Sequence, residues 1–223
     1  MASDPALYPV TLAVDLDTGQ RNRLTAGFRM ILAIPHMFLS GFVGSMGNVS
    51  INLGRPDTGF FEISSSLFAA GVLGFAASIC AFISWFAILF TGSHPQGLWD
   101  FEAFVLRWQV RTSAYVALFR DEYPPFGDAD YPAAVMLERP EGPRDRLSVG
   151  LRIFYLIPHV IVLFFLGIAW FFTTVVAWFA ILFTGAYPAS LADFGKGVFR
   201  WETRVAAYML LLRDEYPPFS LSA

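Results

Sequence analysis

Residues 153–192 read IFYLIPHVIVLFFLGIAWFFTTVVAWFAILFTGAYPASLA, a run of 40 residues without a single Asp, Glu, Lys or Arg. A helix that crosses a bilayer needs about 20 mostly apolar residues. The run is therefore long enough for two short helices, and we expect them at Leu147–Leu166 and Ile168–Thr184, with a turn near Gly167. The alternatives are one long bent helix, or a hairpin that stops short of the far leaflet.

Two further runs lack charged residues, from Met30 to Gly54 and from Ile63 to Trp99. Each holds one predicted span, at Leu24–Val43 and at Leu67–Thr91, which brings the expected total to four transmembrane helices. We do not expect the first of these to be a cleaved signal peptide. Its amino-terminal flank is acidic, whereas the flank of a signal peptide is short and basic.

The composition places the chain among integral membrane proteins. Hydrophobic residues make up 56% of the 223 residues, and Phe alone contributes 24. Charged residues make up 15%, where soluble domains have about 25%. The net charge of −3 indicates no nucleic-acid partner, and a lone cysteine, Cys80, excludes an intramolecular disulfide. Disordered chains, basic nucleic-acid-binding domains and disulfide-rich secreted scaffolds are all excluded.

An internal repeat is the strongest signal in the sequence. The Ile-Pro-His motif at 34–36 returns at 157–159, an offset of 123 residues that the upstream Arg-x-Arg-Leu motif shares. The strings WFAILFTG and RW return with an offset of 93, as does RDEYPPF, which moves from 120–126 to 213–219. The fall in offset from 123 to 93 means that the first copy carries 30 extra residues. We place them in an outer loop at 44–66.

These patterns predict an all-α integral membrane protein with four transmembrane helices. Each copy is expected to be a helical hairpin followed by an amphipathic helix on the cytoplasmic side of the membrane. An even number of spans per copy gives both copies the same orientation, related by a pseudo-twofold axis along the membrane normal. The predicted divisions are an N-terminal segment (1–20), copy one (21–126), a connector (127–143), copy two (144–219) and a tail (220–223).

The basic residues predict the orientation. Of the 15 Lys and Arg, only Arg55 lies in a predicted hairpin loop, and the other 14 flank span ends or lie on connecting segments. Basic residues are enriched on the cytoplasmic side of membrane proteins. We therefore expect a multi-pass protein with both termini and the connector in the cytoplasm and the 44–66 loop outside.

Residues 98–120 and 191–213 are too polar to span a membrane. Basic residues on one side and aromatic residues on the other are typical of a helix at the membrane interface. We interpret these helices as anchors of the fold, and recognition of anionic lipid headgroups is the alternative. The residues expected to contact headgroups are Arg107, Trp108, Arg111, Arg200, Trp201 and Arg204.

Two segments outside the spans have the alternating pattern of short β-strands. Residues 8–16 place Val10, Leu12, Val14 and Leu16 on one side. Residues 131–137 occupy the corresponding place before the second copy. We expect the two segments to pair with each other beneath the membrane.

The main candidates for chemistry are His36 and His159, which follow Pro35 and Pro158. Each lies about 18 Å into its predicted span, close to the bilayer centre, where ionisable residues raise a functional hypothesis. Two such histidines could meet across the pseudo-twofold axis and bind a metal or haem, or relay protons. The structural alternative, which we favour, is a neutral imidazole that hydrogen-bonds backbone exposed at the proline.

Arg29 and Arg152 precede the histidines by seven residues and lie on nearly the same helical face. We expect these side chains to extend to the cytoplasmic surface and anchor their helices there. They complete the candidate intramembrane site.

Enzyme motifs are missing from the sequence: it has no phosphate-binding glycine loop, nucleophile elbow or HExxH run. We expect no catalytic activity and no cofactor. The favoured interpretation is an accessory or scaffold subunit that contacts membrane lipids and other membrane subunits or a second copy of itself. One alternative is a lipid-handling or small-molecule transport protein with a site near the paired histidines. The other is a protein with histidine-bound haem or metal.

The repeated string from Trp-Phe-Ala-Ile-Leu-Phe-Thr-Gly through Arg-Trp to Tyr-Pro-Pro-Phe resembles a bacterial membrane family, the domain of unknown function four-three-eight-nine. The Ile-Pro-His motif fits the same family. The resemblance covers residues 21–126 and 144–219, and it implies two tandem copies of the domain in a bacterial cytoplasmic membrane. It implies no catalytic residues, because none are assigned to the family.

Overall fold

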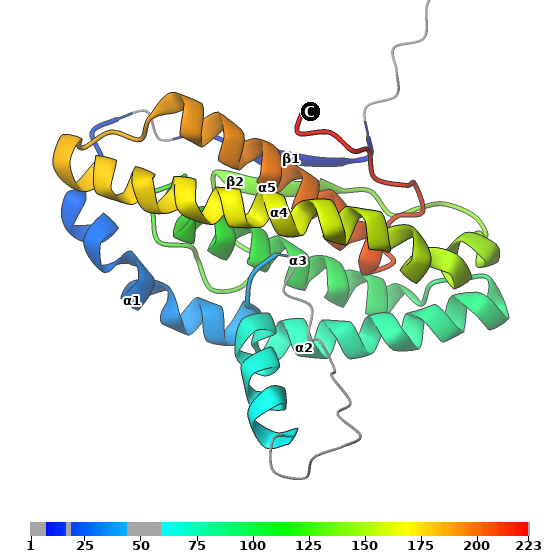
Figure 1. Cartoon of the computed structure of the whole chain (residues 1–223). Helices are drawn as coiled ribbons and strands as arrows, with labels where there is room; N and C mark the ends of the chain where they lie inside the picture. The colour runs from blue at the N-terminus through cyan, green and yellow to red at the C-terminus, as the bar shows by residue number, and fades with distance from the viewer. Residues whose placement is uncertain (1–7, 17–18, 44–58, 223) are drawn as a thin grey trace, which may run out of the picture.

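The computed structural model describes residues 8–16, 19–43 and 59–222, most of which are helical (Figure 1). The described elements are β1 (Val10–Val14), α1 (Arg23–Ser40), α2 (Gly59–Thr91), α3 (Gln96–Val116), β2 (Ala133–Leu137), α4 (Arg146–Thr184) and α5 (Ala189–Met209). The mostly helical class is confirmed. Most of the predicted outer loop, residues 44–58, lies outside the described residues, and the rest of it, residues 59–66, is helical and belongs to α2.

α4 is a single helix of 39 residues that runs straight through Gly167. Asp145 caps its first turn by accepting hydrogen bonds from the backbone N–H groups of Leu147 and Ser148, and Gly185 ends it in the left-handed conformation. The predicted turn near Gly167 is therefore wrong, and one long helix is the correct alternative. A lone glycine costs a helix only about 1 kcal/mol relative to alanine, which is too little to break so long an apolar segment.

The first copy contains the same long helix cut in two. With the offsets of 123 and 93, α1 corresponds to 146–163 and residues 71–91 of α2 correspond to 164–184. The extra 30 residues are thus inserted where α4 continues without interruption. Gly71 interrupts α2 with a non-helical kink. A Cβ on Gly71 would lie 2.6 Å from the carbonyl carbon of Ser40, so the end of α1 lies directly against the part of α2 that begins at Gly71. Figure 1 shows α1 leading into this part of α2, and the predicted hairpin is wrong.

The long helices of the two copies are antiparallel. The Trp85 indole of α2 donates to the Val149 carbonyl near the start of α4, at 2.9 Å. The Trp178 indole near the end of α4 donates to the Ala26 carbonyl near the start of α1, also at 2.9 Å. Trp85 is equivalent to Trp178 and Val149 is equivalent to Ala26, so the two contacts are the same contact made in both directions between the copies. This indicates a pseudo-twofold axis perpendicular to the long helices. The prediction of two hairpins laid parallel is therefore wrong.

α3 and α5 form the centre of the molecule. α3 packs against α1, α2 and β2, and α5 packs against α4 and β1. Side chains such as Leu106, Val110 and Phe199 are fully buried there. The helical prediction for 98–120 and 191–213 is confirmed in outline. The apolar faces of both helices pack into the protein core, whereas we expected them to face lipid.

The predicted pairing of the two short strands is confirmed. β1 and β2 are antiparallel, with Val10 opposite Leu137 and Val14 opposite Ala133. The buried Val10, Ala133 and Val135 join the main hydrophobic core together with residues of α3 and α5. The sheet therefore ties the N-terminal segment to the connector and covers the central helices.

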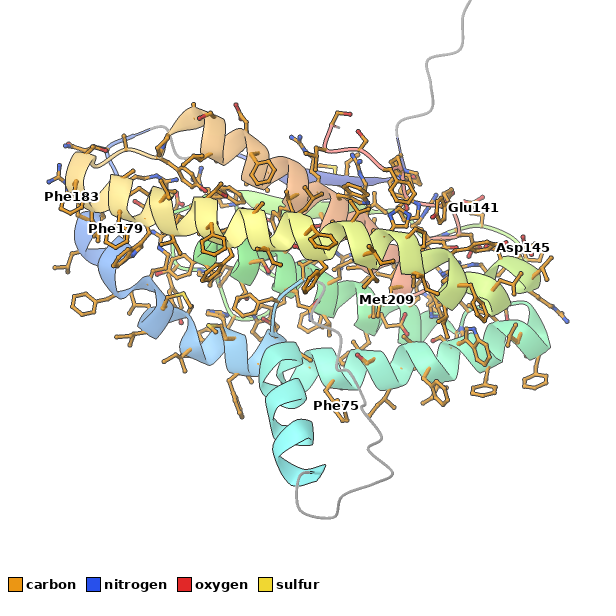
Figure 2. All side chains as sticks on the ribbon, in the orientation of Figure 1. Phe75, Glu141, Asp145, Phe179, Phe183 and Met209 are labelled. Atoms are coloured by element: carbon orange, nitrogen blue, oxygen red, sulfur yellow. The ribbon has the colours of Figure 1, made fainter. Side chains whose placement is uncertain are left out.

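The long helices expose an apolar face on the side away from the sheet. Phe183 is 77% exposed, Phe90 is 76% exposed and Leu24 is 72% exposed. Figure 2 shows Phe179 and Phe183 projecting from the outer side of α4. Among the described residues, Ala70–Thr91 and Arg146–Thr184 are apolar and long enough to cross a membrane. Length and composition alone thus support two such helices and do not confirm four.

Candidate functional site

Asp214 joins two arginines in the second copy. Arg144 donates to both of its carboxylate oxygens, from Nε at 2.5 Å and from Nη2 at 2.6 Å, and Arg152 donates to Oδ1 at 2.8 Å. Arg144 also donates to the Leu211 carbonyl, and Arg152 to the Tyr208 carbonyl. The cluster therefore fixes the end of α5 against the start of α4.

The first copy repeats this cluster around Asp121. Arg21 donates to the carboxylate at 2.9 Å and Arg29 at 2.5 Å, and the backbone N–H of Asn22 donates at 3.0 Å. Burial would raise the pKa of Asp121, but these hydrogen bonds and the two positive charges outweigh it and hold the pKa below its usual value. The pKa of Asp214 is lowered by the corresponding arginines against the same burial effect.

Arg29 and Arg152 do not extend to a surface as expected. They are 1% and 2% exposed, and their guanidinium groups lie over the rings of Tyr115 and Tyr208, at 4.7 and 4.1 Å from the ring centroids. The expectation failed because a partner far along the chain, an Asp that follows α3 or α5, neutralises each arginine inside the fold.

Each candidate histidine is held by a tryptophan of its own copy. The Trp108 indole donates to Nδ1 of His36 at 2.9 Å, and the Trp201 indole donates to Nδ1 of His159 at 3.0 Å. The His36 ring stacks on Phe126 with centroids 4.2 Å apart. Both histidines are fully buried. A hydrogen bond accepted at Nδ1 requires the neutral imidazole, with its proton on Nε2.

The structure does not bring the two histidines together. Because the long helices are antiparallel, with Ala26 packed near Ile181, the register places His36 and His159 roughly 18 Å apart along the helix direction. Across the described residues, no group of three or more His, Cys, Asp or Glu side chains is placed to hold a metal ion. Pro35 and Pro158 lie inside continuous helices, and the histidine partner is an indole and not freed backbone.

The residues expected to contact headgroups fall into two groups. Arg111 donates to the Gly127 carbonyl and to Asp128, and Arg204 donates to the Ser222 carbonyl, so these two buried side chains hold the segments after their helices. Arg107, 3.7 Å from Asp128, and Arg200 are partly exposed. Trp108 and Trp201 are nearly buried and bind the histidines. Headgroup contact stays a prediction for the two partly exposed arginines.

A buried polar cluster in the first copy was not anticipated. Ser84 of α2 donates to Glu102 of α3 at 3.0 Å, and the other Glu102 oxygen lies 3.3 Å from Nε2 of His94. Burial raises the pKa of Glu102. The carboxyl group separates the hydroxyl from the imidazole, so the cluster lacks the hydroxyl–imidazole contact of a serine nucleophile. The sequence did carry a sign of this cluster. The equivalent positions in copy two are Ala177, Gly195 and Tyr187, so all three polar residues are particular to the first copy.

A second carboxyl group, Glu202 of α5, faces the middle of α4 beside Gly167, where a Cβ would lie 3.9 Å from its Oε1. Burial raises the pKa of Glu202 to about 8. The equivalent residue in the first copy is Gln109, which donates to the Ser40 carbonyl at the end of α1. The same position thus holds an amide, Gln109, beside the break between α1 and α2, and a protonated carboxylic acid, Glu202, beside the continuous helix α4.

Comparison with known families gives one match, to the family described as "Domain of unknown function (DUF4389)", over residues 65–127 and 146–220. No curated protein and no solved structure matches the chain. The two matched regions cover more than half of the sequence. The second spans nearly all of copy two, and the first spans copy one from within α2 onward. The chain therefore belongs to the DUF4389 family and carries two tandem copies of its domain.

Proposed function

We propose that the chain is a non-enzymatic accessory or scaffold subunit of a bacterial cytoplasmic-membrane assembly. The observation that carries this proposal is the direction of the side chains. The polar residues that recur in both copies, namely the arginine–aspartate clusters and the histidine–tryptophan pairs, point inward and hold helices together. Among the described residues, most of the large exposed hydrophobic side chains belong to the long helices.

The long helices are best accommodated flat in one leaflet of the membrane. At 1.5 Å per residue, the 39 residues of α4 extend about 58 Å, whereas the hydrocarbon core is only about 30 Å thick. If α4 stood upright, α3 and α5 beside it would carry charged residues such as Asp100 and Arg107 into the bilayer, at a high cost. A flat arrangement keeps these helices and the sheet outside the hydrocarbon.

Charge distribution supports the same arrangement. The Asp121 and Asp214 clusters lie near the starts of α1 and α4, and the antiparallel packing puts these starts at opposite ends of the molecule. Upright helices would place basic residues on both sides of the membrane, against their usual bias toward the cytoplasm. With the helices flat, the pseudo-twofold axis runs along the membrane normal, and both termini and the connector lie on the cytoplasmic side.

The exposed aromatic side chains on this face suit packing against other membrane helices. To test this, a photoreactive amino acid replaces Phe86 or Phe179, which are 40% and 48% exposed, in cells that produce the protein at its natural level. We expect protein adducts of defined mass at these positions. The control position is Glu141, which is exposed on the connector and lies at the opposite end of α4 from Phe179 (Figure 2). Adducts with lipid alone at both phenylalanines would contradict the scaffold role and favour a lipid-handling protein.

A further inference from the structure

Two grooves on the apolar face are related by the pseudo-twofold axis. The first lies between α2, α4 and α5 and has a volume of about 480 Å³. The second lies between α1, α4 and the end of α3 and has a volume of about 280 Å³. Eight lining positions correspond between them: Ser78, Ala81, Phe82, Trp85, Arg152, Ile153, Met209 and Leu211 in the first match Phe171, Thr174, Val175, Trp178, Arg29, Met30, Val116 and Leu118 in the second.

One substitution contributes to the difference in size. Ser78 in the larger groove corresponds to Phe171 in the smaller one, so a hydroxymethyl group stands where the other copy has a phenyl ring. The larger groove also extends along α4 past Leu156 and Ile157 to Val160 and Ile161. The larger groove is therefore longer as well as wider than the groove between α1, α4 and the end of α3.

The larger groove offers little for a polar ligand to bind. The Ser78 hydroxyl donates to the Gly74 carbonyl at 2.9 Å. The Arg152 Nη1 and Nη2 atoms donate to the Tyr208 carbonyl and to Asp214, and the Nε atom, which has no hydrogen-bond partner, is buried. The Trp85 indole N–H donates to the Val149 carbonyl, and the remaining lining residues are apolar. A ligand with its own donors or acceptors would have to bury them unpaired, which is costly, whereas a hydrocarbon chain has none to bury.

We propose that the groove between α2, α4 and α5 binds one acyl chain of a membrane phospholipid. The inference rests on the membrane location proposed above. The groove is continuous with the exposed apolar face, because Phe82, Ile153 and Val160 line it and are each more than half exposed. A chain of a phospholipid in the surrounding leaflet therefore enters it without leaving apolar surroundings. Since the groove contacts only the chain, binding does not depend on the headgroup.

The test uses the full chain reconstituted in vesicles of phosphatidylethanolamine and phosphatidylglycerol, with a trace of phosphatidylethanolamine that carries a diazirine in one acyl chain. After illumination, labelled positions are mapped on the peptides. We expect labelling at Val160 and Met209 to exceed that at Phe172, which is exposed to lipid outside both grooves. A probe built on phosphatidylglycerol should give the same pattern.

Ser78→Phe copies the second groove into the first and should lower labelling in the groove about tenfold, the effect of losing ~1.4 kcal/mol of binding. Phe171→Ser is the matched variant and should add labelling around Met30. Val160→Trp fills the groove from an exposed position. In this variant the same loss should be seen at Met209, which covers the case in which Ser78→Phe does not fold.

Labelling spread evenly over the apolar face, or unchanged in Ser78→Phe and Val160→Trp, would overturn the acyl-chain site while leaving the membrane location intact. Absence of labelling anywhere on the long helices would instead contradict the membrane location itself.

Discussion

At the scale of single residues, Asp121 and Asp214 explain why the two copies share so many arginines. Each carboxylate is bound by two arginines that lie 62–100 residues away in the chain. The same arginines hold carbonyl groups beyond the ends of α3 and α5, including those of Leu118 and Leu211, which have left-handed φ values of 65° and 61°. The clusters thus fix strained turns that few non-glycine residues adopt.

Asp214→Asn should therefore be strongly destabilising. Removal of one partner leaves Arg144 and Arg152 as buried positive charges, and we expect the free energy of unfolding to fall by roughly 2–4 kcal/mol. The measurement is chemical denaturation of the purified protein in detergent, with unfolding monitored by tryptophan fluorescence. Asp193→Asn is the control, since this carboxylate is 71% exposed beside Lys196, and exposed pairs contribute only about 0–1 kcal/mol. Equal effects of the two variants would show that the cluster does not hold the fold.

Glu202 gives a prediction about pH. The pKa of Glu202 is raised to about 8 in the folded protein, against 4.5 for the free group, so the folded chain keeps a proton that the unfolded chain releases. The contribution of Glu202 to stability is therefore fully present below about pH 4.5 and is lost as the pH rises toward 8, by up to ~1.4 kcal/mol per pH unit. Glu202→Gln should remove this dependence, as measured by unfolding at pH 5 and pH 8.

The exposed Glu141 provides the comparison for this measurement. Glu141→Gln should keep the wild-type loss of stability between pH 5 and pH 8. An identical loss in Glu202→Gln would show that another group titrates in this range.

At the scale of elements, the joint between α1 and α2 shows how an insertion is tolerated inside a long helix. Gly71 has φ 69° and ψ 165°, a conformation open to glycine. The joint is closed by Gln109, which donates to the Ser40 carbonyl, and by the Ser40 hydroxyl, which pairs with Thr112 of α3 at 3.0 Å. The broken helix is thus fixed from the side by α3.

Gly71→Ala should be among the most damaging small substitutions in the protein. The new Cβ would meet Ser40 and Gly41 in a conformation that alanine avoids, and we expect a loss of about 3 kcal/mol or more. In contrast, a Cβ on Gly97 of α3 would meet nothing within 4 Å. Gly97→Ala should stabilise the helix by about 0.5–1 kcal/mol. Thermal unfolding of both variants measures the two changes in stability. Only a small loss of stability in Gly71→Ala would mean that the end of α1 does not lie against Gly71.

The elements themselves were largely predictable from the sequence. The polar helices near 98–120 and 191–213 and the two strands follow from residue periodicity. The pairing of the strands was expected from their corresponding places before the two copies. The division of 147–184 into two helices was wrong because length was the only guide to it. The drop in offset from 123 to 93 located the insertion correctly, but a hairpin loop and a cut helix give the same offset.

At the scale of the whole molecule, the sequence could not show which faces meet. Arg29 and Arg152 looked like surface anchors because their partners lie at least 62 residues away, where no local pattern reaches. His36 and His159 looked like a pair because they are equivalent, yet equivalent residues on antiparallel helices meet only near the axis. The repeat predicted the internal symmetry, and packing alone decided its direction.

The depth of α4 in the bilayer tests most directly whether the long helices lie flat in one leaflet. Nitroxide labels at Phe154, Phe165 and Phe179, introduced in a Cys80→Ser background, cover about 37 Å of the helix on side chains that are at least 48% exposed. Depth is measured by collision with oxygen and with a polar nickel complex in vesicles. We predict closely similar depths for all three labels. A deep Phe165 between two shallow labels on opposite sides of the membrane would contradict the account.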